Sequence, residues 1–482
     1  MAADTARGST SEMTQGERYI ARVFAAQKAA FAAEPFPAYR TRIERLDGLI
    51  RAVAMNEARI VDAVNADFGS RARTETLLAE TVISIAAARE AKRSLKRWMR
   101  PKTVKTPLHM LPAKSRIEPQ PLGVIGIISP WNYPVQLALS PAVAALAAGN
   151  RVMIKPSELT PKTSETLAAI LRAEFDESVL AVIVGGVETG QAFASFPFDH
   201  LLFTGSTAIG RRIAEAAAKN LTPVTLELGG KSPAIIDEGA DLAAAARSIA
   251  HGKMFNAGQT CVAPDYVLAP RARLDAAVEA IADAARTLYP EIDTTADYTS
   301  IVSDRHFSRL KSLIDEARRA GSKMVEIGSP NALDAQRKLP LTLVVDPPMH
   351  IGLMQEEIFG PVLPVIGVES VKAAVDFVNK RERPLALYWF GRDASIRDEV
   401  LKSTISGGVT VNDTLWHVAQ EHLPFGGVGE SGIGSYHGEA GFRAFSHMKP
   451  VFYQSRLSSG AMLHPPYTDK TARILNLARK VM

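Results

Sequence analysis

The sequence contains one cysteine, Cys261, among its 482 residues. A single thiol cannot form an internal disulfide, which excludes a small secreted domain held together by disulfides. Nor can it provide the several thiolates that a zinc ribbon or an iron–sulfur cluster requires. The spacing of the histidines offers no pair of metal ligands either, so no metal site is predicted.

A large excess of charge of one sign is also lacking. The chain has 56 Lys and Arg against 51 Asp and Glu, a net charge of +5, which does not indicate a polyanionic partner. Residues 89–105 are locally basic and could form a nucleic-acid patch or the solvated face of a helix that leads into a linker. The interleaved aromatic side chains of single-strand binders are missing there, so we favour the solvated face and expect no nucleic-acid partner.

No uninterrupted hydrophobic run is long enough to cross a bilayer. Residues 1–17 are small and polar and lack the apolar core of a signal peptide, so they are expected to be frayed. In the most apolar stretch, 122–154, prolines and asparagines interrupt any spanning helix, which predicts buried core instead. The weak apolar stripe at 474–481 is expected to dock on the body or on a neighbouring subunit. We therefore expect a cytoplasmic protein without membrane attachment.

The remaining composition, 46% hydrophobic and 22% charged, is that of a globular protein, and the length suggests about three domains. Residues 18–100 have helical periodicity, which the proline-rich segment 101–121 interrupts. From residue 122, short apolar runs alternate with helical stretches. The predicted strands are 123–128, 151–154, 179–184, 201–203 and 224–228, and the predicted helices are 135–148, 161–174, 188–193 and 209–218.

This alternation predicts an α/β fold with helices on both faces of a parallel sheet. A second α/β run begins near Ser232, with a helix at 241–255 that Asp237 or Asp241 could cap. The further helices of this run are 274–288 and 305–320, and its strands are 266–269, 341–345 and 362–365. Ligands of such sheets bind outside the carboxyl ends of the strands, so the chemistry is expected in the loops that follow them.

One such loop, 203–210, follows a strand and opens a helix. Gly205 allows a ligand to approach the backbone, and the helix N-terminus offers free N–H groups to a phosphate. Gly205 and Gly210 are five residues apart with no glycine between them, so the loop is not a G-x-G-x-x-G motif. By itself it is equally compatible with a plain strand-to-helix turn.

Two side chains in other loops are candidates for catalysis. Cys261 follows the small-residue stretch 256–260 and is either a buried small hydrophobe or a nucleophile, whose pKa should lie below the free value of about 8.5. Glu227 stands between two leucines at a strand end. It is either a salt-bridged structural glutamate or a desolvated general base with a raised pKa.

Asn132 lies in the loop after the first predicted strand, between Pro130 and Pro134. The two prolines restrict the backbone and so hold the asparagine amide in one place. An amide placed in advance suits an oxyanion that forms only during a reaction. The segment Lys155–Glu158 follows the second strand at the same edge.

Seven motifs, in this order, resemble those of the aldehyde dehydrogenase superfamily over residues 20–455. They are PWN at 130–132, KPSE at 155–158, FTGST at 203–207, LELGGKSP at 226–233, GQTC at 258–261, EEIFGP at 356–361 and PFGGVGESG at 424–432. Within the superfamily, residues 258–267 and 425–438 resemble the class 3 branch. The run 117–150 is most similar to bacterial coniferyl-aldehyde dehydrogenases, which implies an aromatic aldehyde as substrate.

The resemblance implies a covalent mechanism. Cys261 matches the nucleophile that forms a thiohemiacetal with the aldehyde, and Asn132 matches the side-chain donor of the oxyanion hole. Hydride transfer to a nicotinamide leaves a thioester. Glu227 matches the base that activates water to hydrolyse this thioester to a carboxylic acid.

The resemblance also implies a dinucleotide cofactor. Trp131, Lys155 and Glu158 match residues around the adenosine ribose, and the glycine loop matches the pyrophosphate site. The residues of that loop are Gly205, Ser206 and Gly210. Glu357 matches the carboxylate that holds the nicotinamide ribose, with Phe359 beside it. A carboxylate at Glu158 should repel a 2′-phosphate, so NAD is favoured, and NADP stays open.

Other functions stay open at this point. The substrate could be a medium- or long-chain aliphatic aldehyde, CoA could replace water in attacking the thioester, or a non-catalytic protein could use the fold. Without a nicotinamide, Cys261 could serve a hydrolase together with His251 or His306. The resemblance implies a NAD-binding Rossmann-like domain (20–100 and 122–231), an α/β catalytic domain (232–434), and an oligomerisation element with tail (101–121 and 435–482). A homodimer is expected.

Overall fold

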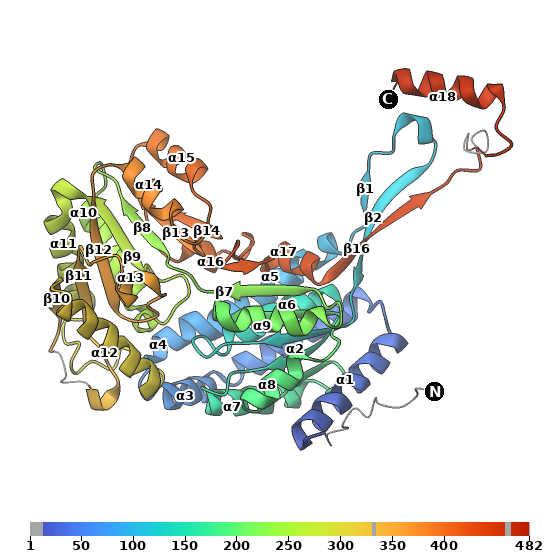
Figure 1. The fold of residues 1–482 in the computed structure, drawn as a ribbon. Helices are drawn as coiled ribbons and strands as arrows, with labels where there is room; N and C mark the ends of the chain where they lie inside the picture. The colour runs from blue at the N-terminus through green and yellow to red at the C-terminus, as the bar shows by residue number, and fades with distance from the viewer. Residues whose placement is uncertain (1–12, 330–333, 458–463, 482) are drawn as a thin grey trace, which may run out of the picture.

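The computed structural model describes residues 13–329, 334–457 and 464–481. Three sheets organise these residues, and Figure 1 shows the two larger ones side by side, with the third projecting from the body. The α/β fold predicted from the alternation of strands and helices is confirmed.

Helices form the N-terminal part, as the periodicity of residues 18–100 predicts. They are α1 (Gln15–Ala33), α2 (Tyr39–Ala54), α3 (Glu57–Phe68), α4 (Arg73–Thr76), the π-helical turn η1 (Leu77–Val82) and α5 (Ile83–Trp98). The Thr14 hydroxyl accepts a hydrogen bond from the Glu17 backbone, and the Glu17 side chain accepts one in return. This capping box starts the first helix. The expectation that residues 1–17 are frayed is therefore wrong for residues 14–17, which form the cap and the first turn of the helix. Residues 1–12 lie outside the described residues.

The first large sheet has six strands in the order β15-β7-β6-β3-β4-β5. They are β3 (Val124–Ile128), β4 (Arg151–Lys155), β5 (Leu180–Val182), β6 (His200–Gly205), β7 (Val224–Leu228) and the antiparallel β15 (Gly432–Ile433). One face packs on α6 (Gln136–Ala148) and α7 (Pro161–Glu174), and α2 and α5 pack on these helices in turn. The other face packs on α1, α8 (Val187–Ala194) and α9 (Thr207–Ala218). Helices on both faces are therefore confirmed.

The order of the strands predicts where a ligand would bind this sheet. From β3 the chain proceeds through β4 and β5 on one side, and then returns to β6 and β7 on the other. Ligands of parallel sheets bind where the order reverses, at the carboxyl ends of the strands. The loops after β3 and β6 flank this reversal, and they contain Trp131, Asn132, Gly205 and Ser206.

The second large sheet has seven strands in the order β10-β11-β12-β9-β8-β13-β14. They are β8 (Pro233–Ile236), β9 (Tyr266–Pro270), β10 (Lys323–Ile327), β11 (Leu341–Val345), β12 (Val362–Val368), β13 (Ala386–Phe390) and β14 (Gly408–Val411). Its helices include α10 (Leu242–Met254), α11 (Leu274–Leu288), α12 (Asp304–Arg319), α13 (Gly352–Gln355), α14 (Val371–Asn379) and α15 (Ala394–Ser403). Of the two proposed caps, Asp241 caps α10 by accepting from the Ala244 backbone.

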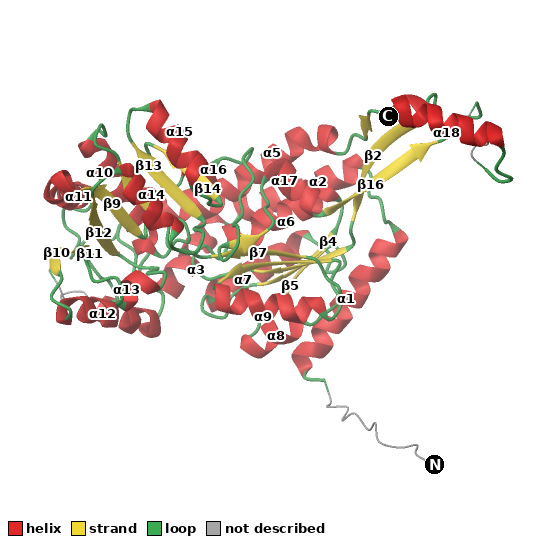
Figure 2. Cartoon of the chain, turned by 45° about the horizontal axis from the view of Figure 1, so that its top comes forward, coloured by secondary structure: helices red, strands yellow, loops and turns green. Residues whose placement is uncertain are grey.

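The third sheet consists of β1 (Lys102–Val104), β2 (Lys114–Pro121) and β16 (Ser446–Tyr453), all antiparallel. Both views show it reaching away from the body, with α18 (Asp469–Val481) at its far end (Figures 1 and 2). Between the sheets, α17 (Gly438–Ala444) packs on α5 and α6. The C-terminal segment therefore contacts helices beside the first sheet before it enters the third.

The apolar stretch 122–154 forms β3, α6 and β4, and every residue of α6 is buried. The prediction of buried core is confirmed. None of the helices within the described ranges is long and apolar enough to cross a bilayer.

Candidate active site

The backbone before Cys261 is left-handed at three consecutive residues. Asn256, Ala257 and Gly258 have φ values of 52°, 51° and 73°. A Cβ at Gly258 would come within 2.5 Å of the Gly360 carbonyl oxygen, so only glycine fits this close approach. The turn directs the following residues into the space between the two large sheets. Strained backbone of this kind gathers at functional sites.

Side chains replace the regular hydrogen bonds that such a turn cannot make. The Asn256 amide donates to the carbonyl oxygens of Asn132 at 3.0 Å and Gln259 at 3.2 Å. The Gln259 amide donates to the Ser300 carbonyl at 3.1 Å and accepts from the Val302 backbone at 2.9 Å. The loop that carries the cysteine is therefore held from two other segments, at Asn132 and at residues 300–302.

Asn132 lies directly against this loop, as the oxyanion-hole interpretation requires. Its side chain is 3% exposed, and its Nδ2 donates to the Gln259 carbonyl at 3.1 Å. A primary amide has two N–H donors, so a second remains for a ligand. Next to it, the Tyr133 hydroxyl and the Thr260 hydroxyl are 2.6 Å apart, which joins the loop after β3 to the residue before Cys261.

A buried ion network, which the sequence analysis did not predict, holds the backbone of Asn132 in place. Arg71 donates to the Asn132 carbonyl at 3.1 Å and to the Glu80 carboxylate at 3.0 Å. The other Glu80 oxygen accepts the Val135 and Gln136 backbone N–H groups, at 3.0 and 2.8 Å, where α6 begins. Arg71 and Glu80 are both inaccessible to solvent. The π-helical turn that carries Glu80 is a further mark of a functional region.

We predict that Arg71→Met destabilises the protein by about 3–5 kcal/mol, because it leaves the buried Glu80 carboxylate without its cation. Chemical denaturation measures this loss. The control is Arg51→Met, which breaks the exposed ion pair with Glu174 and should cost about 1 kcal/mol or less. Equal losses in both variants would contradict the role of the buried network.

Glu227 is desolvated, as the general-base hypothesis predicts. It is 2% exposed in β7, and among the described residues neither of its carboxylate oxygens has a hydrogen-bond partner. Burial raises its pKa well above the ordinary value. A salt-bridged structural glutamate would have a cation beside it. The orphaned oxygens instead leave the carboxylate free to bind water or substrate.

The expectation of a lowered pKa for Cys261 is wrong for the protein alone. Burial and the carboxylates of Glu357 and Glu227 raise the pKa of the thiol to about 12. The backbone N–H groups of Cys261 and Val262 oppose this shift. The sequence analysis did not foresee that two carboxylates from other segments would lie near the sulfur. The thiolate is therefore disfavoured in the protein alone.

Cys261 is half-buried and lines a cavity of about 440 Å³, an ordinary volume for a small-molecule site. Most of the lining side chains are apolar. They include Leu78, Ile83, Leu137, Phe255, Val262, Leu288, Leu415, Trp416, Val418 and Phe425. The lining residues Tyr133, Val262 and Phe425 are buried, whereas Leu78 and Trp416 are 57% and 64% exposed and mark the open end. An apolar molecule can therefore reach Cys261.

The residues predicted to hold the dinucleotide lie at the reversal of strand order. Lys155 ends β4 and is 2% exposed, and among the residues that the structure describes its ammonium group donates only to the adjacent Pro156 carbonyl, at 2.6 Å. Glu158 is exposed nearby, and its charge opposes the lowering of the Lys155 pKa by burial. Ser206 is the N-cap of α9 but makes no side-chain cap, so the first N–H groups of that helix are available to a phosphate.

Gly210, the last glycine of this loop, has a packing reason of its own. A Cβ there would come within 2.6 Å of the Leu228 side chain, so glycine allows α9 to approach β7 closely. Gly205 likewise leaves no room for a side chain, because a Cβ would lie 2.5 Å from the Phe203 ring. The loop is therefore compact, and the two glycines serve different contacts.

Glu357 approaches the first sheet from the second. A Cβ at Gly229 would lie 1.9 Å from a Glu357 carboxylate oxygen, and burial together with Asp265 raises the Glu357 pKa to about 8. Phe359 packs edge-on against Trp131 with ring centroids 5.3 Å apart. Trp131, predicted near the adenosine ribose, thus also contacts a residue predicted near the nicotinamide ribose.

A lysine that the sequence analysis quoted without a role holds this loop. The ammonium group of Lys231 lies 2.6 Å from Asp265 and donates to the carbonyls of Leu353 and Glu356, at 2.9 and 2.8 Å. Asp265 also accepts the Ile358 backbone N–H at 3.0 Å. This pair fixes both sides of Glu357. A lysine directly after a glycine pair is the only signal that the sequence offered.

The histidines of the hydrolase alternative are placed differently. His251 lines the cavity of Cys261 and packs on Phe255, whereas His306 packs on Trp131 and lies 2.8 Å from the Ser303 hydroxyl. In the described structure, no hydrogen bond joins either ring to Cys261. A hydrolase that relies on a cysteine–histidine pair therefore finds no support here.

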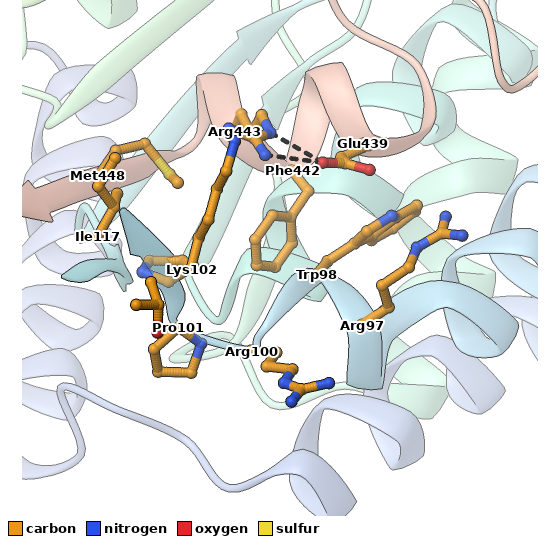
Figure 3. A pocket seen from close by; sticks show the side chains of 12 residues that line it. Arg97, Trp98, Arg100, Pro101, Lys102, Ile117, Glu439, Phe442, Arg443 and Met448 are labelled. Atoms are coloured by element: carbon orange, nitrogen blue, oxygen red, sulfur yellow. Dashed lines mark hydrogen bonds and ion pairs between the residues drawn. The ribbon is translucent and has the colours of Figure 1, made fainter. Parts of the chain in front are cut away.

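A second cavity, of about 380 Å³, lies apart from these residues at the root of the third sheet (Figure 3). It is lined by Trp98, Phe442 and several basic side chains, and Arg443 is paired with Glu439 at 2.9 Å. Arg97, Arg100 and Lys102 come from the basic stretch 89–105 and are exposed. None of the predicted site residues lines this cavity.

Comparison with known proteins identifies the arrangement. The model of the aldehyde dehydrogenase family matches residues 6–451. The chain is 49% identical to a probable coniferyl aldehyde dehydrogenase of Caulobacter vibrioides, over 93% of this chain and 94% of the relative. It is 46% identical to the coniferyl aldehyde dehydrogenase of a Pseudomonas strain, over 90% and 91%. It is also 41% identical to aldehyde dehydrogenase family 3 member A2 of Rattus norvegicus, over 89% and 88%.

Solved structures agree with this. The substrate-bound AldH of Staphylococcus aureus superposes with a TM-score of 0.90 at 38% identity, over 95% of this chain and 99% of that one. An aldehyde dehydrogenase of Mycobacterium tuberculosis in complex with NAD⁺ gives 0.80 at 30% identity, over 94% and 91%. With matches over nearly its whole length, the chain belongs to the aldehyde dehydrogenase family.

Proposed function

We propose that the protein oxidises aromatic aldehydes of the coniferyl type to carboxylic acids, with NAD as the hydride acceptor. The observation that carries this proposal is the apolar cavity that ends at Cys261, with Asn132 and Glu227 beside it. An apolar cavity favours a planar aromatic substrate over a polar one. The names of the bacterial relatives at 46–49% identity support the same substrate class.

In the proposed reaction, the Cys261 thiol gives up its proton to solvent, and the thiolate attacks the aldehyde carbon to form a thiohemiacetal. The carbonyl oxygen becomes an oxyanion, which the Asn132 amide and the Cys261 backbone N–H stabilise. The nicotinamide, when bound, supplies the acceptor for the hydride. Glu227 then removes a proton from water, which attacks the resulting thioester carbon. The carbon–sulfur bond breaks and the acid leaves.

The test is the appearance of reduced nicotinamide when the protein is mixed with NAD and coniferyl aldehyde, with octanal as the comparison. We expect a higher kcat/KM for coniferyl aldehyde. A higher value for octanal would favour an aliphatic aldehyde dehydrogenase, and turnover that depends on added CoA would show that CoA attacks the thioester instead of water. Turnover without nicotinamide would contradict the proposal.

The residues that would hold the dinucleotide fit it. The free N–H groups at the start of α9 suit the pyrophosphate, and the buried Lys155, with Glu158 beside it, can hydrogen-bond ribose hydroxyls. Glu357, held by Lys231 and Asp265, can do the same for the second ribose. The carboxylate of Glu158 disfavours a 2′-phosphate, which supports NAD over NADP.

We predict that Glu158→Ser raises kcat/KM for NADP by about tenfold relative to NAD, because it removes the repulsion of the 2′-phosphate. Initial rates with each cofactor measure this. Glu165→Ser, which removes an equal charge from the exposed face of α7, serves as the control and should leave the ratio unchanged. An unaltered ratio in Glu158→Ser would contradict the assignment of this carboxylate.

We further propose the domain boundaries and the assembly. Residues 20–100 and 122–231 form the NAD-binding domain, 232–434 the catalytic domain, and 101–121 with 435–482 the oligomerisation element and tail. The three sheets support this division, with β15 and α17 contributing to the first domain. The projecting sheet exposes Phe452 and Tyr453, which supports a homodimer; analytical ultracentrifugation measures it. The single thiol, which must stay reduced, supports a cytoplasmic location.

A further inference from the structure

The polar side chains that line the Cys261 cavity differ in whether they already have hydrogen-bond partners within the protein. Gln136 donates to the Ser140 hydroxyl at 3.1 Å, and Thr260 is bonded to Tyr133. Thr414 donates to the Ser248 carbonyl at 2.9 Å. These groups already have partners, so they offer little to a ligand.

The carboxylate of Asp413 also has hydrogen-bond partners already. Its carboxylate accepts the Thr414 backbone N–H and the Trp416 indole N–H, both at 2.8 Å. These two bonds orient the carboxylate at the open end of the cavity, where Trp416 is exposed. Its charge acts on His251 and opposes the effect of burial on the pKa of that ring.

His251 remains. It lies in the last turn of α10, lines the cavity and packs on Phe255 with ring centroids 5.6 Å apart. Within the described parts of the chain, its ring nitrogens make no hydrogen bond. Partial desolvation by the cavity wall lowers its pKa although the residue is exposed, so the neutral ring is favoured at neutral pH, and one of its nitrogens can accept a hydrogen bond.

The place of His251 suits the far end of a rigid substrate. Cys261 lies at the buried end of the cavity, while His251 is exposed, like Leu78 and Trp416 at the open end. A conjugated aromatic aldehyde is planar, so once its carbonyl reaches the sulfur, the para substituent must point towards the open end. A saturated chain has no polar group to place there.

We propose that the imidazole of His251 accepts a hydrogen bond from the para-hydroxyl group of the substrate and thereby selects phenolic aldehydes. This inference rests on the proposed function and deepens it. A site that hydrogen-bonds a substrate hydroxyl discriminates against an analogue that lacks it, because a polar group of the site is then left unpaired. The bond lies far from the reacting carbon, so it should affect KM rather than kcat.

The experiment compares kcat/KM of the full-length protein for coniferyl aldehyde, its 4-O-methyl ether and octanal. In the wild type, we expect a preference of about tenfold for the phenol over the ether, the effect of one net hydrogen bond. His251→Phe keeps a planar ring and should reduce this ratio to about one through a higher KM for the phenol. His251→Gln, whose amide oxygen can accept, should retain part of the preference.

Two further variants separate this role from a structural one. Leu78→Ala removes apolar lining and should lower kcat/KM for all three aldehydes by a similar factor. Arg247→Gln tests another polar side chain of the cavity lining, one that is exposed and makes no hydrogen bond in the described structure, and should leave the ratio unchanged.

An unchanged ratio in His251→Phe, an equal loss for phenol and ether, or a loss of preference in Arg247→Gln instead would overturn the proposal. If the wild type oxidises neither aromatic aldehyde, it is the proposed function that fails.

Discussion

Cys261→Ala is expected to lower turnover by at least about 10⁴-fold, because the covalent intermediate can no longer form. Steady-state formation of reduced nicotinamide measures this loss. The binding of NAD, followed by titration calorimetry, should be unchanged, since the predicted cofactor residues lie on other segments. The thermal midpoint should change little, because the half-buried thiol has a small volume.

The single cysteine makes this test clear. Any thiol reagent that inactivates the wild type must act at Cys261, and loss of activity should follow the incorporation of one label per chain. Turnover of the alanine variant at a substantial fraction of the wild-type rate would exclude the sulfur as the nucleophile. A loss of NAD binding in this variant would show that the cavity itself had changed.

For Glu227→Gln we expect a fall in kcat of about 10²–10⁴-fold, the usual contribution of a general base. The thioester should accumulate, so a burst of reduced nicotinamide appears before slow turnover. Mass spectrometry of the quenched protein would detect the acyl group on Cys261. A variant that turns over rapidly without a burst would remove Glu227 as the base.

The pH dependence follows from the raised pKa of Glu227. The carboxylate accepts a proton only when ionised, so in the wild type the hydrolysis of the thioester should accelerate as the pH rises through this pKa. In Glu227→Gln this limb should disappear, because the amide does not titrate in this range. Single-turnover rates across the pH range separate the limb from effects on binding.

The buried carboxylate of Glu227 should also lower the free energy of unfolding of the protein. A group whose pKa is higher in the folded state stabilises that state most below its unfolded pKa, of about 4.3 for Glu, and the contribution is lost as the pH rises through the folded pKa. As the pH rises from the unfolded pKa towards neutral, the wild type therefore loses part of this contribution. We expect the free energy of unfolding of Glu227→Gln, measured by chemical denaturation at neutral pH, to be at least about 1 kcal/mol higher than that of the wild type. The variant would thus gain stability and lose activity.

Much of the fold followed from local patterns. The strands and helices between residues 122 and 230 agree with the structure because buried parallel strands are short apolar runs and their helices have a clear period. β10, β13 and β14 were not predicted. β10 is a half-exposed antiparallel edge strand, and the other two lie in segments that the sequence analysis did not divide into elements.

The sequence predicted the candidate catalytic residues but not the buried ion pair that supports them. Cys261, Asn132 and Glu227 were found from unusual residues in loops and at strand ends, and the structure brings all three loops together. Arg71 and Glu80 were missed because a charge in a helical pattern is normally solvated. Only the packing of α6 on that segment takes both side chains out of water.

The order of residue types along the chain was enough to determine the α/β fold, the family resemblance and the one thiol available for chemistry, since each depends on local composition. The ionisation of that thiol was decided by tertiary structure alone. Glu227 and Glu357 are distant from Cys261 in the chain, and only folding places their charges beside the sulfur in a medium that screens them weakly. The same folding sets His251 at one end of a cavity and the sulfur at the other.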